Sequence, residues 1–242
     1  MSTSDHNDKT LPKFAPDDPA HDFDYWFVRL NMEIVSHFIR GRRILELGCF
    51  AGLSTLLLLD HCDDLTVVDL SDENIALTRQ RLDEAGRTAS LICDRWENFA
   101  PSGSFSDIMM WRGLEHVVDP VALLGQIRGW LEPAGRLHIV VPNAMSLHRR
   151  IGVQMGMLAD VHDLNERDHA AGHQRVYDRP LLTRHLKEAG FAVTHWEGIF
   201  LKPLSNDQMK SWPEPLIRAL YAVGREIPDY CAELYMCASP SV

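Results

Sequence analysis

The chain has 242 residues and a net charge of −10 at pH 7, with 45% hydrophobic and 24% charged residues. This length and composition suit one soluble domain with a sizeable core, and the negative charge, without a lysine-rich run, opposes binding to nucleic acid. No apolar run approaches the roughly twenty residues of a membrane span and the N-terminus has no apolar signal core, so we expect a cytoplasmic protein without a membrane partner.

The N-terminal part of the chain is expected to contribute an arm and a helix. Residues 1–20 are polar and punctuated by prolines, which predicts a flexible arm ahead of one domain over residues 21–242. Between residues 21 and 39 apolar side chains recur at helical spacing, which predicts a helix that carries Tyr25 and Arg29 as polar positions.

The stretch that is most informative about function joins a predicted strand at residues 43–47 to a predicted helix at residues 54–59. Gly48 and Gly52 lie between them, where glycine allows a backbone conformation closed to other residues and a close approach of a ligand. Such a turn places backbone N–H groups and a helix N-terminus against the ligand. Asp69 ends a second predicted strand about twenty residues further on, where its carboxylate is placed to accept hydrogen bonds from ribose hydroxyls.

The pattern Glu46-x-Gly48-x-x-x-Gly52 resembles the first motif of the class I S-adenosylmethionine (SAM)-dependent methyltransferases. Glu46 lies just inside the strand end, where it is placed to hold a cationic amine, and this suits SAM better than a dinucleotide. Phe50 departs from the family, which usually has glycine at its position. A bulky side chain there would crowd a pyrophosphate, which argues against NAD, whereas the methionine of SAM carries no phosphate.

Two later segments extend the resemblance. Asp94 ends a predicted strand at residues 89–94, where the family often has an acid that binds the adenine amino group, and Arg95 and Trp96 would flank the ring. Residues 113–120, Gly-Leu-Glu-His-Val-Val-Asp-Pro, resemble a hallmark of the small-molecule, ubiquinone-biosynthesis-like branch. The final aspartate and proline of this segment are typical of a helix N-terminus.

The order of the predicted elements implies an α/β fold. Strands alternate with helices, which favours a parallel sheet with right-handed crossovers. By resemblance, we expect a Rossmann-like, seven-stranded, mostly parallel sheet with helices on both faces and the last strand antiparallel beside the sixth. The remaining predicted strands are residues 65–69, 105–111, 137–141, 191–196 and 233–238, and the remaining predicted helices are residues 72–85, 120–131 and 179–189.

The resemblance covers the chain from about residue 43 to residue 143 and, more weakly, from residue 177 onward. It implies SAM as the cofactor and an N-terminal helix that closes over it, with Tyr25 and Arg29 near the methionine end. The expected cofactor-binding residues are Tyr25, Glu46, Gly48, Cys49, Phe50, Gly52, Asp69, Leu70, Asp94, Arg95, Trp96 and Trp111.

Residues 144–177 fit no unit of the sheet, and we expect them to form an insertion that covers the substrate. Methyl transfer from a sulfonium is an in-line displacement that often requires a base for the acceptor proton. His116 is the leading candidate for this base because histidine titrates near neutral pH, and a structural role for it stays open. His148 and His173, both in the insertion, are the other candidate catalytic residues.

The insertion also carries acidic side chains and histidines whose spacing is common by chance, so we expect no metal site. They are His162, Asp163, Glu166, Asp168 and His169. The five cysteines likewise show no metal-ligand spacing and are expected to be reduced.

The function that we expect is transfer of a methyl group from SAM to an O or N atom of a small-molecule metabolite. The Asn/Asp-Pro-Pro-Tyr motif of methyltransferases that act on nucleic acid and glutamine amino groups is absent, and residues 111–114 read Trp-Arg-Gly-Leu instead. Two alternatives stay open: a protein that binds SAM without turnover, and a methyltransferase that acts on carbon. The oligomeric state stays open too.

Overall fold

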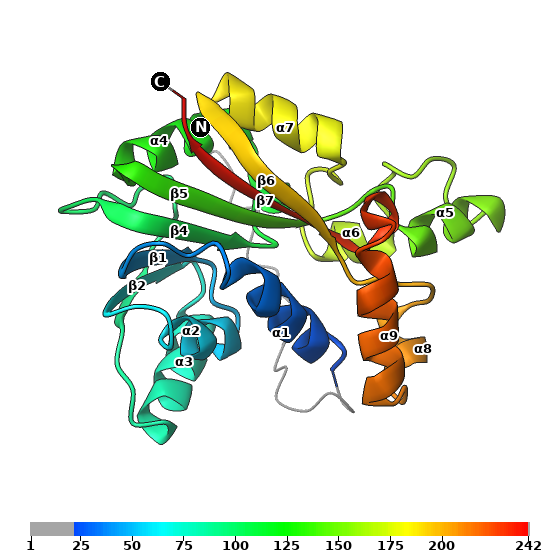
Figure 1. The fold of residues 1–242 in the computed structure, drawn as a ribbon, viewed down its shortest axis with the longest axis horizontal. Helices are drawn as coiled ribbons and strands as arrows, with labels where there is room; N and C mark the ends of the chain where they lie inside the picture. The colour runs from blue at the N-terminus through cyan, green and yellow to red at the C-terminus, as the bar shows by residue number, and fades with distance from the viewer. Residues whose placement is uncertain (1–21, 242) are drawn as a thin grey trace, which may run out of the picture.

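A computed structural model describes residues 22–241, so the predicted arm at residues 1–20 lies outside the described residues. A seven-stranded sheet in the order β3-β2-β1-β4-β5-β7-β6 carries helices on both faces (Figure 1). The strands are β1 (Arg43–Leu47), β2 (Asp64–Asp69), β3 (Ser90–Cys93), β4 (Phe105–Trp111), β5 (Leu131–Pro142), β6 (Phe191–Ile199) and β7 (Glu233–Pro240). The pairs from β3 to β5 are parallel, and β7 lies antiparallel between β5 and β6. The predicted fold class is confirmed.

The central strands are apolar on both faces, which is why they read as continuous hydrophobic runs in the sequence. In β4, Met109 and Trp111 belong to one core cluster, whereas Ile108 and Met110 belong to the other. This alternation follows from the two-residue repeat of a strand, in which successive side chains point to opposite faces. The sheet therefore separates two hydrophobic cores.

Helices cover both of these cores. Buried residues of α1, α2, α3 and α9 belong to the first cluster, and those of α4 and α7 belong to the second. The helices are α1 (Asp24–Val35), α2 (Leu53–Leu58), α3 (Asp72–Glu84), α4 (Pro120–Trp130), α5 (Leu147–Gln154), α6 (Glu166–Ala170), α7 (Arg179–Glu188), α8 (Asn206–Met209) and α9 (Glu214–Gly224), with short 3-10 helices at Leu114–His116 and Pro228–Tyr230. No helix among the described residues is long and apolar enough to cross a membrane.

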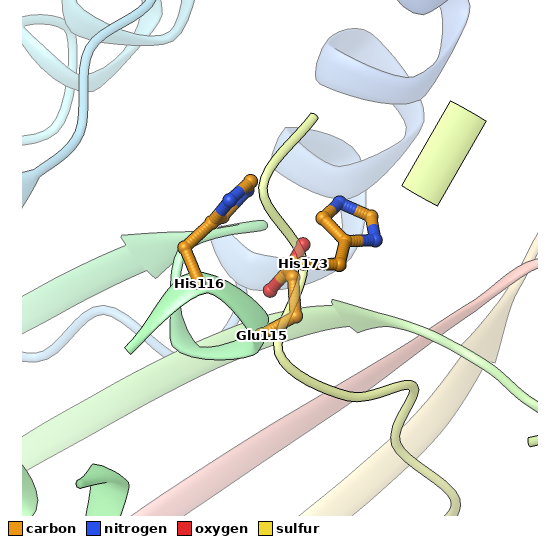
Figure 2. Close-up of side chains that lie close together, drawn as sticks. All are labelled: Glu115, His116 and His173. Carbon is orange, nitrogen blue, oxygen red and sulfur yellow. The ribbon is translucent and has the colours of Figure 1, made fainter. Parts of the chain in front are cut away.

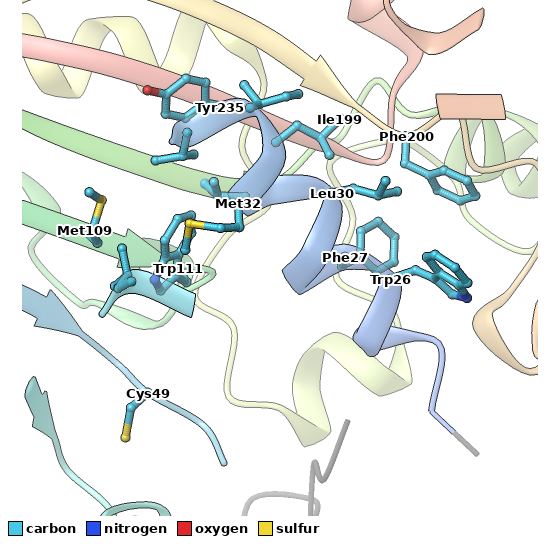
Figure 3. Packing of buried hydrophobic residues seen from close by; sticks show 14 of the residues in the cluster. Trp26, Phe27, Leu30, Met32, Cys49, Met109, Trp111, Ile199, Phe200 and Tyr235 are labelled. Carbon is cyan, nitrogen blue, oxygen red and sulfur yellow. The ribbon is translucent and has the colours of Figure 1, made fainter. Parts of the chain in front are cut away.

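Helix α1 is seated by aromatic packing. The ring of Phe27 lies 5.7 Å from that of Phe200, which follows the end of β6, and Phe23 lies 5.5 Å from the same ring. Figure 3 shows Trp26, Phe27 and Leu30 on this side of α1. Because each aromatic side chain buries a large area, this contact places the helix firmly over the first core cluster.

The predicted elements differ from the observed ones mainly at their ends. The predicted helix at residues 21–39 is shorter, as α1, and the predicted strand at residues 137–141 is part of the longer β5. β5 starts earlier because Leu131 pairs with Phe105 before a register shift absorbs the following turn. Helices α8 and α9, between β6 and β7, had no counterpart in the prediction.

The segment 144–177 leaves the sheet and returns to the place where it left. The N–H of Ala144 donates to the carbonyl of Tyr177 at 2.7 Å, and Asn143 forms an isolated bridge with Tyr177. Between these points the chain forms α5 and α6, which lie together beyond the end of the sheet in Figure 1. We call residues 144–177 the lid segment; that it covers the substrate stays a prediction.

Candidate active site

The loop after β1 has the backbone conformation that its glycines predicted. Gly48 has φ 86° and Gly52 has φ 81°, both in the left-handed region. A Cβ at Gly52 would lie 2.9 Å from the Cα of Thr78, and one at Gly48 would lie 3.2 Å from the ring of Trp96. Glycine at position 52 therefore makes room for α3, and the close approach of a ligand to this loop stays a prediction.

Phe50 keeps the left-handed backbone of the glycine that the family usually has at this position. Its φ is 48°, which is uncommon and costly for a bulky residue. Its side chain lines a pocket next to the loop. Phe50 thus combines a backbone conformation typical of glycine with a ring that takes up space in the pocket.

Asp69 organises this loop from the end of β2. One carboxylate oxygen accepts a hydrogen bond from the N–H of Cys49 at 2.9 Å, and the other accepts from Ser71 N–H at 2.8 Å and Asn74 Nδ2 at 3.1 Å. The thiol of Cys49 also lies 3.6 Å from the oxygen that accepts from its N–H, so the carboxylate is surrounded by four donors. The predicted bond from Asp69 to a ribose hydroxyl stays a prediction.

Glu46 lies under the same loop and is completely buried. Its carboxyl accepts hydrogen bonds from Ser54 Oγ and Thr55 Oγ1, both at 2.6 Å, and from Trp111 Nε1 at 3.1 Å. Burial raises its pKa to about 7, against the effect of these three donors. Glu46 thus ties β1, α2 and β4 together, and its predicted contact with the SAM ammonium stays a prediction.

The pocket beside the loop lies between α1, the glycine loop and the end of β4. The residues that line it are Asp24, Phe27, Val28, Asn31, Cys49, Phe50, Ala51, Leu53, Ser54, Trp111 and Arg112. Cys49, Phe50 and Trp111 were expected there. Asp24 and Asn31 were missed, because the sequence pointed instead to Tyr25 and Arg29. Tyr25 packs edge-on against Trp26 and beneath the guanidinium of Arg29 and is not among the lining residues, so its contact with SAM stays a prediction.

The predicted adenine end lies along the ends of β2 and β3. Leu70 is 60% exposed, and the Asp94 carboxylate accepts a hydrogen bond from Arg95 N–H at 2.7 Å. Trp96 donates its indole N–H to the carbonyl of Val68 at 3.1 Å, which fixes its ring against the glycine loop. An exposed apolar side chain and an accessible acid are compatible with an adenine ring here, and that contact stays a prediction.

An ionic network closes the pocket at the end of β4. Arg112 lies 2.9 Å from Asp24 of α1 and 3.3 Å from Glu233 of β7, and Glu233 also accepts a hydrogen bond from Asn31 at 2.9 Å. Burial opposes the charge on Arg112, but Asp24, Glu233 and Glu115 raise its pKa above its ordinary value. Arg112 has a φ of 45°, so its backbone is strained as well.

Three titratable side chains converge just beyond Arg112. Glu115 and His116 lie in the 3-10 helix after β4, and His173 comes from the lid segment; one ligand atom of each lies within 4.8 Å of the others (Figure 2). Both oxygens of Glu115 are buried without a hydrogen-bond partner in the described part of the chain. The structure thus brings together two of the three predicted catalytic residues and adds Glu115.

The environment changes how Glu115 and His116 titrate. Burial raises the pKa of Glu115 to about 7, against the nearby charges of His173 and Arg112. Burial, together with His173 and Arg112, lowers the pKa of His116 to about 4, so its imidazole is neutral at neutral pH. The positive charge of Arg112, which acts on Glu115, also opposes a divalent cation at this cluster, and the absence of a metal stays a prediction.

The third predicted catalytic residue, His148, lies apart from this cluster on α5. Burial, with Lys202 and Arg149, lowers its pKa to about 3, and its Nδ1 has no hydrogen-bond partner among residues 22–241. Arg149 is buried and bonds to Asp168 and to the carbonyls of Val161 and Asp163. Arg149 therefore holds parts of the lid segment together from the inside.

Two other side chains of the lid segment take roles away from the cluster. Tyr177 is fully buried in the second core cluster and shares a hydrogen bond with His185 at 3.1 Å. His162 forms ion pairs with Asp160 and Asp178 on the surface.

A comparison with known protein families shows to which family the chain belongs. A family model described as "Methyltransferase domain" matches residues 14–196. The chain is a member of the SAM-dependent methyltransferase family. SAM is the cofactor of this methyltransferase, as the resemblance implied.

Relatives agree with this assignment. The methyltransferase is 25% identical over 218 residues to a ubiquinone biosynthesis O-methyltransferase of Xanthomonas euvesicatoria pv. vesicatoria, covering 84% of this chain and 89% of that protein. A protein of the same name from Idiomarina loihiensis is 29% identical over 99 residues, covering 40% of this chain and 41% of the relative.

Solved structures agree on the fold. A SAM-dependent methyltransferase from Mesorhizobium loti has a TM-score of 0.60 at 18% identity, over 93% of this chain and 99% of that one. The CcbJ methyltransferase from Streptomyces caelestis has a TM-score of 0.63 at 13% identity, over 94% and 98%. The [4+2]-cyclase SpnF also has this fold, with a TM-score of 0.61 at 15% identity, over 96% and 88%.

Proposed function

We propose that this methyltransferase transfers the methyl group of SAM to a hydroxyl oxygen of a small-molecule acceptor. The observation that carries the proposal is the cluster of Glu115, His116 and His173 beside Arg112, which lines the pocket. A hydroxyl must lose its proton as it attacks the methyl carbon, and positioned imidazoles are suited to accept that proton. An amine that binds deprotonated needs no such group. The names of the relatives from Xanthomonas and Idiomarina support the same atom.

In this proposal the pocket holds the methionine part of SAM and the acceptor lies between the 3-10 helix and the lid segment. The hydroxyl oxygen attacks the methyl carbon in line with sulfur, the carbon–sulfur bond breaks, and its electron pair stays on neutral S-adenosylhomocysteine. The hydroxyl proton passes to an imidazole of the cluster. His116, His173 and His148 were the candidates, and His148 lies on α5 outside the three-residue cluster.

Incubation with methyl-labelled SAM and a panel of phenols, catechols, aliphatic alcohols and amines tests the proposal. We expect methyl ethers and S-adenosylhomocysteine in equal amounts, identified by mass spectrometry. Products methylated only on nitrogen or carbon would contradict the choice of oxygen. Binding of SAM without any methylated product would favour the alternative of a SAM-binding protein without turnover.

A further inference from the structure

The candidate that the sequence favoured as the base, His116, is poorly placed for that task. Its ring lies under the lid segment, where the backbone of Ala171 and Gly172 interacts with it. Burial holds its pKa down at about 4, so it accepts a proton only weakly at neutral pH. The N–H of Gln174 also donates to the carbonyl of Glu115 at 2.8 Å, so the 3-10 helix and the lid segment are joined here. These contacts suit a residue that holds the lid segment in position.

His173 has the partner that a base needs. Its Nδ1 lies 3.1 Å from Asp168 Oδ1, at ion-pair distance, although the N–H direction does not make a well-aligned hydrogen bond. Catalytic hydrogen bonds are often loose without substrate and tighten when it binds. The contact favours the proton on Nδ1, which leaves Nε2 as the acceptor nitrogen.

Asp168 is itself fixed by other groups. Its Oδ2 accepts hydrogen bonds from Arg149 Nη1 and from Asn165 N–H, both at 3.0 Å. Burial opposes its charge, but His173, Asn165 and Arg149 together hold its pKa well below the ordinary value. Oδ1 is left to face His173. The two oxygens therefore have separate partners, as in sites where a carboxylate orients a catalytic imidazole.

The ring of His173 also contacts the 3-10 helix after β4. It packs edge-on against His116 at 4.7 Å between ring centroids, and it approaches the partnerless carboxyl of Glu115 (Figure 2). The charged and titratable groups around it are thus Asp168 and Arg149 on the lid segment and Glu115, His116 and Arg112 beyond β4. A hydroxyl between Glu115 and His173 would meet a hydrogen-bond acceptor on both sides.

We propose that Asp168 and His173 form a catalytic dyad carried by the lid segment, in which His173 is the base that takes the acceptor proton and Asp168 is the residue that positions it. The dyad rests on the proposed hydroxyl methylation. The acceptor O–H bond breaks as the O–CH₃ bond forms, and the proton moves to His173 Nε2. The carboxylate of Asp168 then balances the positive charge of the imidazolium until the proton passes to solvent. Turnover therefore requires that the lid segment lie in this position against the 3-10 helix. The pocket proposed for SAM has no lining residue from the lid segment, so SAM binding does not require it.

Three matched variants, His173→Gln, Asp168→Asn and the surface control His162→Gln, separate the dyad from a merely structural role. In an assay with SAM and whichever phenol or alcohol the wild type methylates, we expect the rate of His173→Gln to fall roughly 10²–10⁴-fold with unchanged SAM affinity by calorimetry. The acid limb of its pH–rate profile should vanish. Asp168→Asn should move this limb to lower pH, because the imidazolium loses its carboxylate. His162→Gln changes a surface histidine of the same lid segment and should keep both the limb and the wild-type rate.

A second measurement needs no acceptor and checks the geometry directly. Two-bond ¹H–¹⁵N correlation spectra report which nitrogen of His173 carries the proton. We expect Nδ1–H in the folded wild type and a mixture of tautomers in Asp168→Asn, with thermal unfolding to verify that the variant folds. A protonated Nε2 in the wild type, or a wild-type rate and limb in His173→Gln, would overturn the dyad. If no hydroxyl is methylated, the proposed function fails, yet these spectra still decide whether Asp168 orients His173.

Discussion

Arg112, directly after β4, and Asp24 in the first turn of α1 form an ion pair of 2.9 Å, and both line the pocket beside the glycine loop. The pair links the helix over the pocket to the sheet beneath it. Glu233, 3.3 Å from Arg112 on β7, adds a third charge from a strand far along the chain. The network therefore joins three elements beside this pocket.

Removing Arg112 should destabilise the protein strongly. In Arg112→Gln two buried carboxylates, Asp24 and Glu233, lose their shared cation, and the loss of one partner from such a buried network costs about 3–5 kcal/mol. Urea unfolding measures the change. Arg42→Gln is the matched control, because Arg42 pairs with Asp63 on the surface, and it should leave the unfolding midpoint where it is. Equal midpoints for the two variants would contradict the role of the network.

Glu115 should make stability fall as pH rises through the range from about 4.5 to about 7. Its folded pKa of about 7 lies above the ordinary 4.5, so the folded state keeps a proton that the unfolded state has released, and stability falls as that proton leaves. Glu115→Gln removes this titration. Between about pH 5 and pH 8 the variant should gain up to about 3 kcal/mol in unfolding free energy relative to wild type. Parallel pH profiles of the two proteins would show that Glu115 is not held protonated.

Asp69→Ala should weaken SAM binding and loosen the glycine loop. The variant loses a charge-assisted bond to the ribose, worth about 1.5–3 kcal/mol, and the bonds from Cys49 and Ser71 to the same carboxylate. Calorimetry with SAM measures the first effect, and thermal unfolding without SAM measures the second. Glu46→Gln should also weaken SAM, through loss of negative charge near its ammonium. Unchanged SAM affinity in Asp69→Ala would rule out the ribose contact.

Two substitutions at Phe50 separate backbone strain from packing. Both Phe50→Gly and Phe50→Ala remove the ring, but only glycine adopts a φ of 48° without penalty. Phe50→Gly should therefore be about 1 kcal/mol more stable than Phe50→Ala in urea unfolding. If alanine proved the more stable of the two, the loop would not be strained at this position.

Methyl transfer should need no added metal. A sulfonium is already a good leaving group, and Arg112 places a positive charge beside Glu115, the carboxylate that a cation would need. We expect the rate to be the same before and after treatment with EDTA. Activity that disappears with EDTA and returns with magnesium would make Glu115, His116 and His173 ligands instead.

Much of the fold follows from local patterns in the sequence. The strand runs at β1 and β4 are apolar on both faces, so they had to lie in the centre of a covered sheet. Gly48 has the left-handed backbone that was expected of it, and Gly52 has one too. These features depend on a residue and its near neighbours, which the sequence lists directly.

The tertiary structure decided the rest of the site. Neighbouring residues of a helix point about 100° apart. The apolar pattern of α1 did not show which of two neighbours, Asp24 or Tyr25, lines the pocket; the structure shows that it is Asp24. Arg112 meets Glu233 only because β7 inserts beside β5. Asp168 meets His173 through the local turn after α6, in which the N–H of His173 donates to the carbonyl of Asp168, whereas His173 meets Glu115 because the lid segment returns to the sheet at Tyr177. The motifs of the sequence resembled a family and located its glycine loop, whereas contacts between distant parts of the chain brought Glu115, the two histidines and the charged network together.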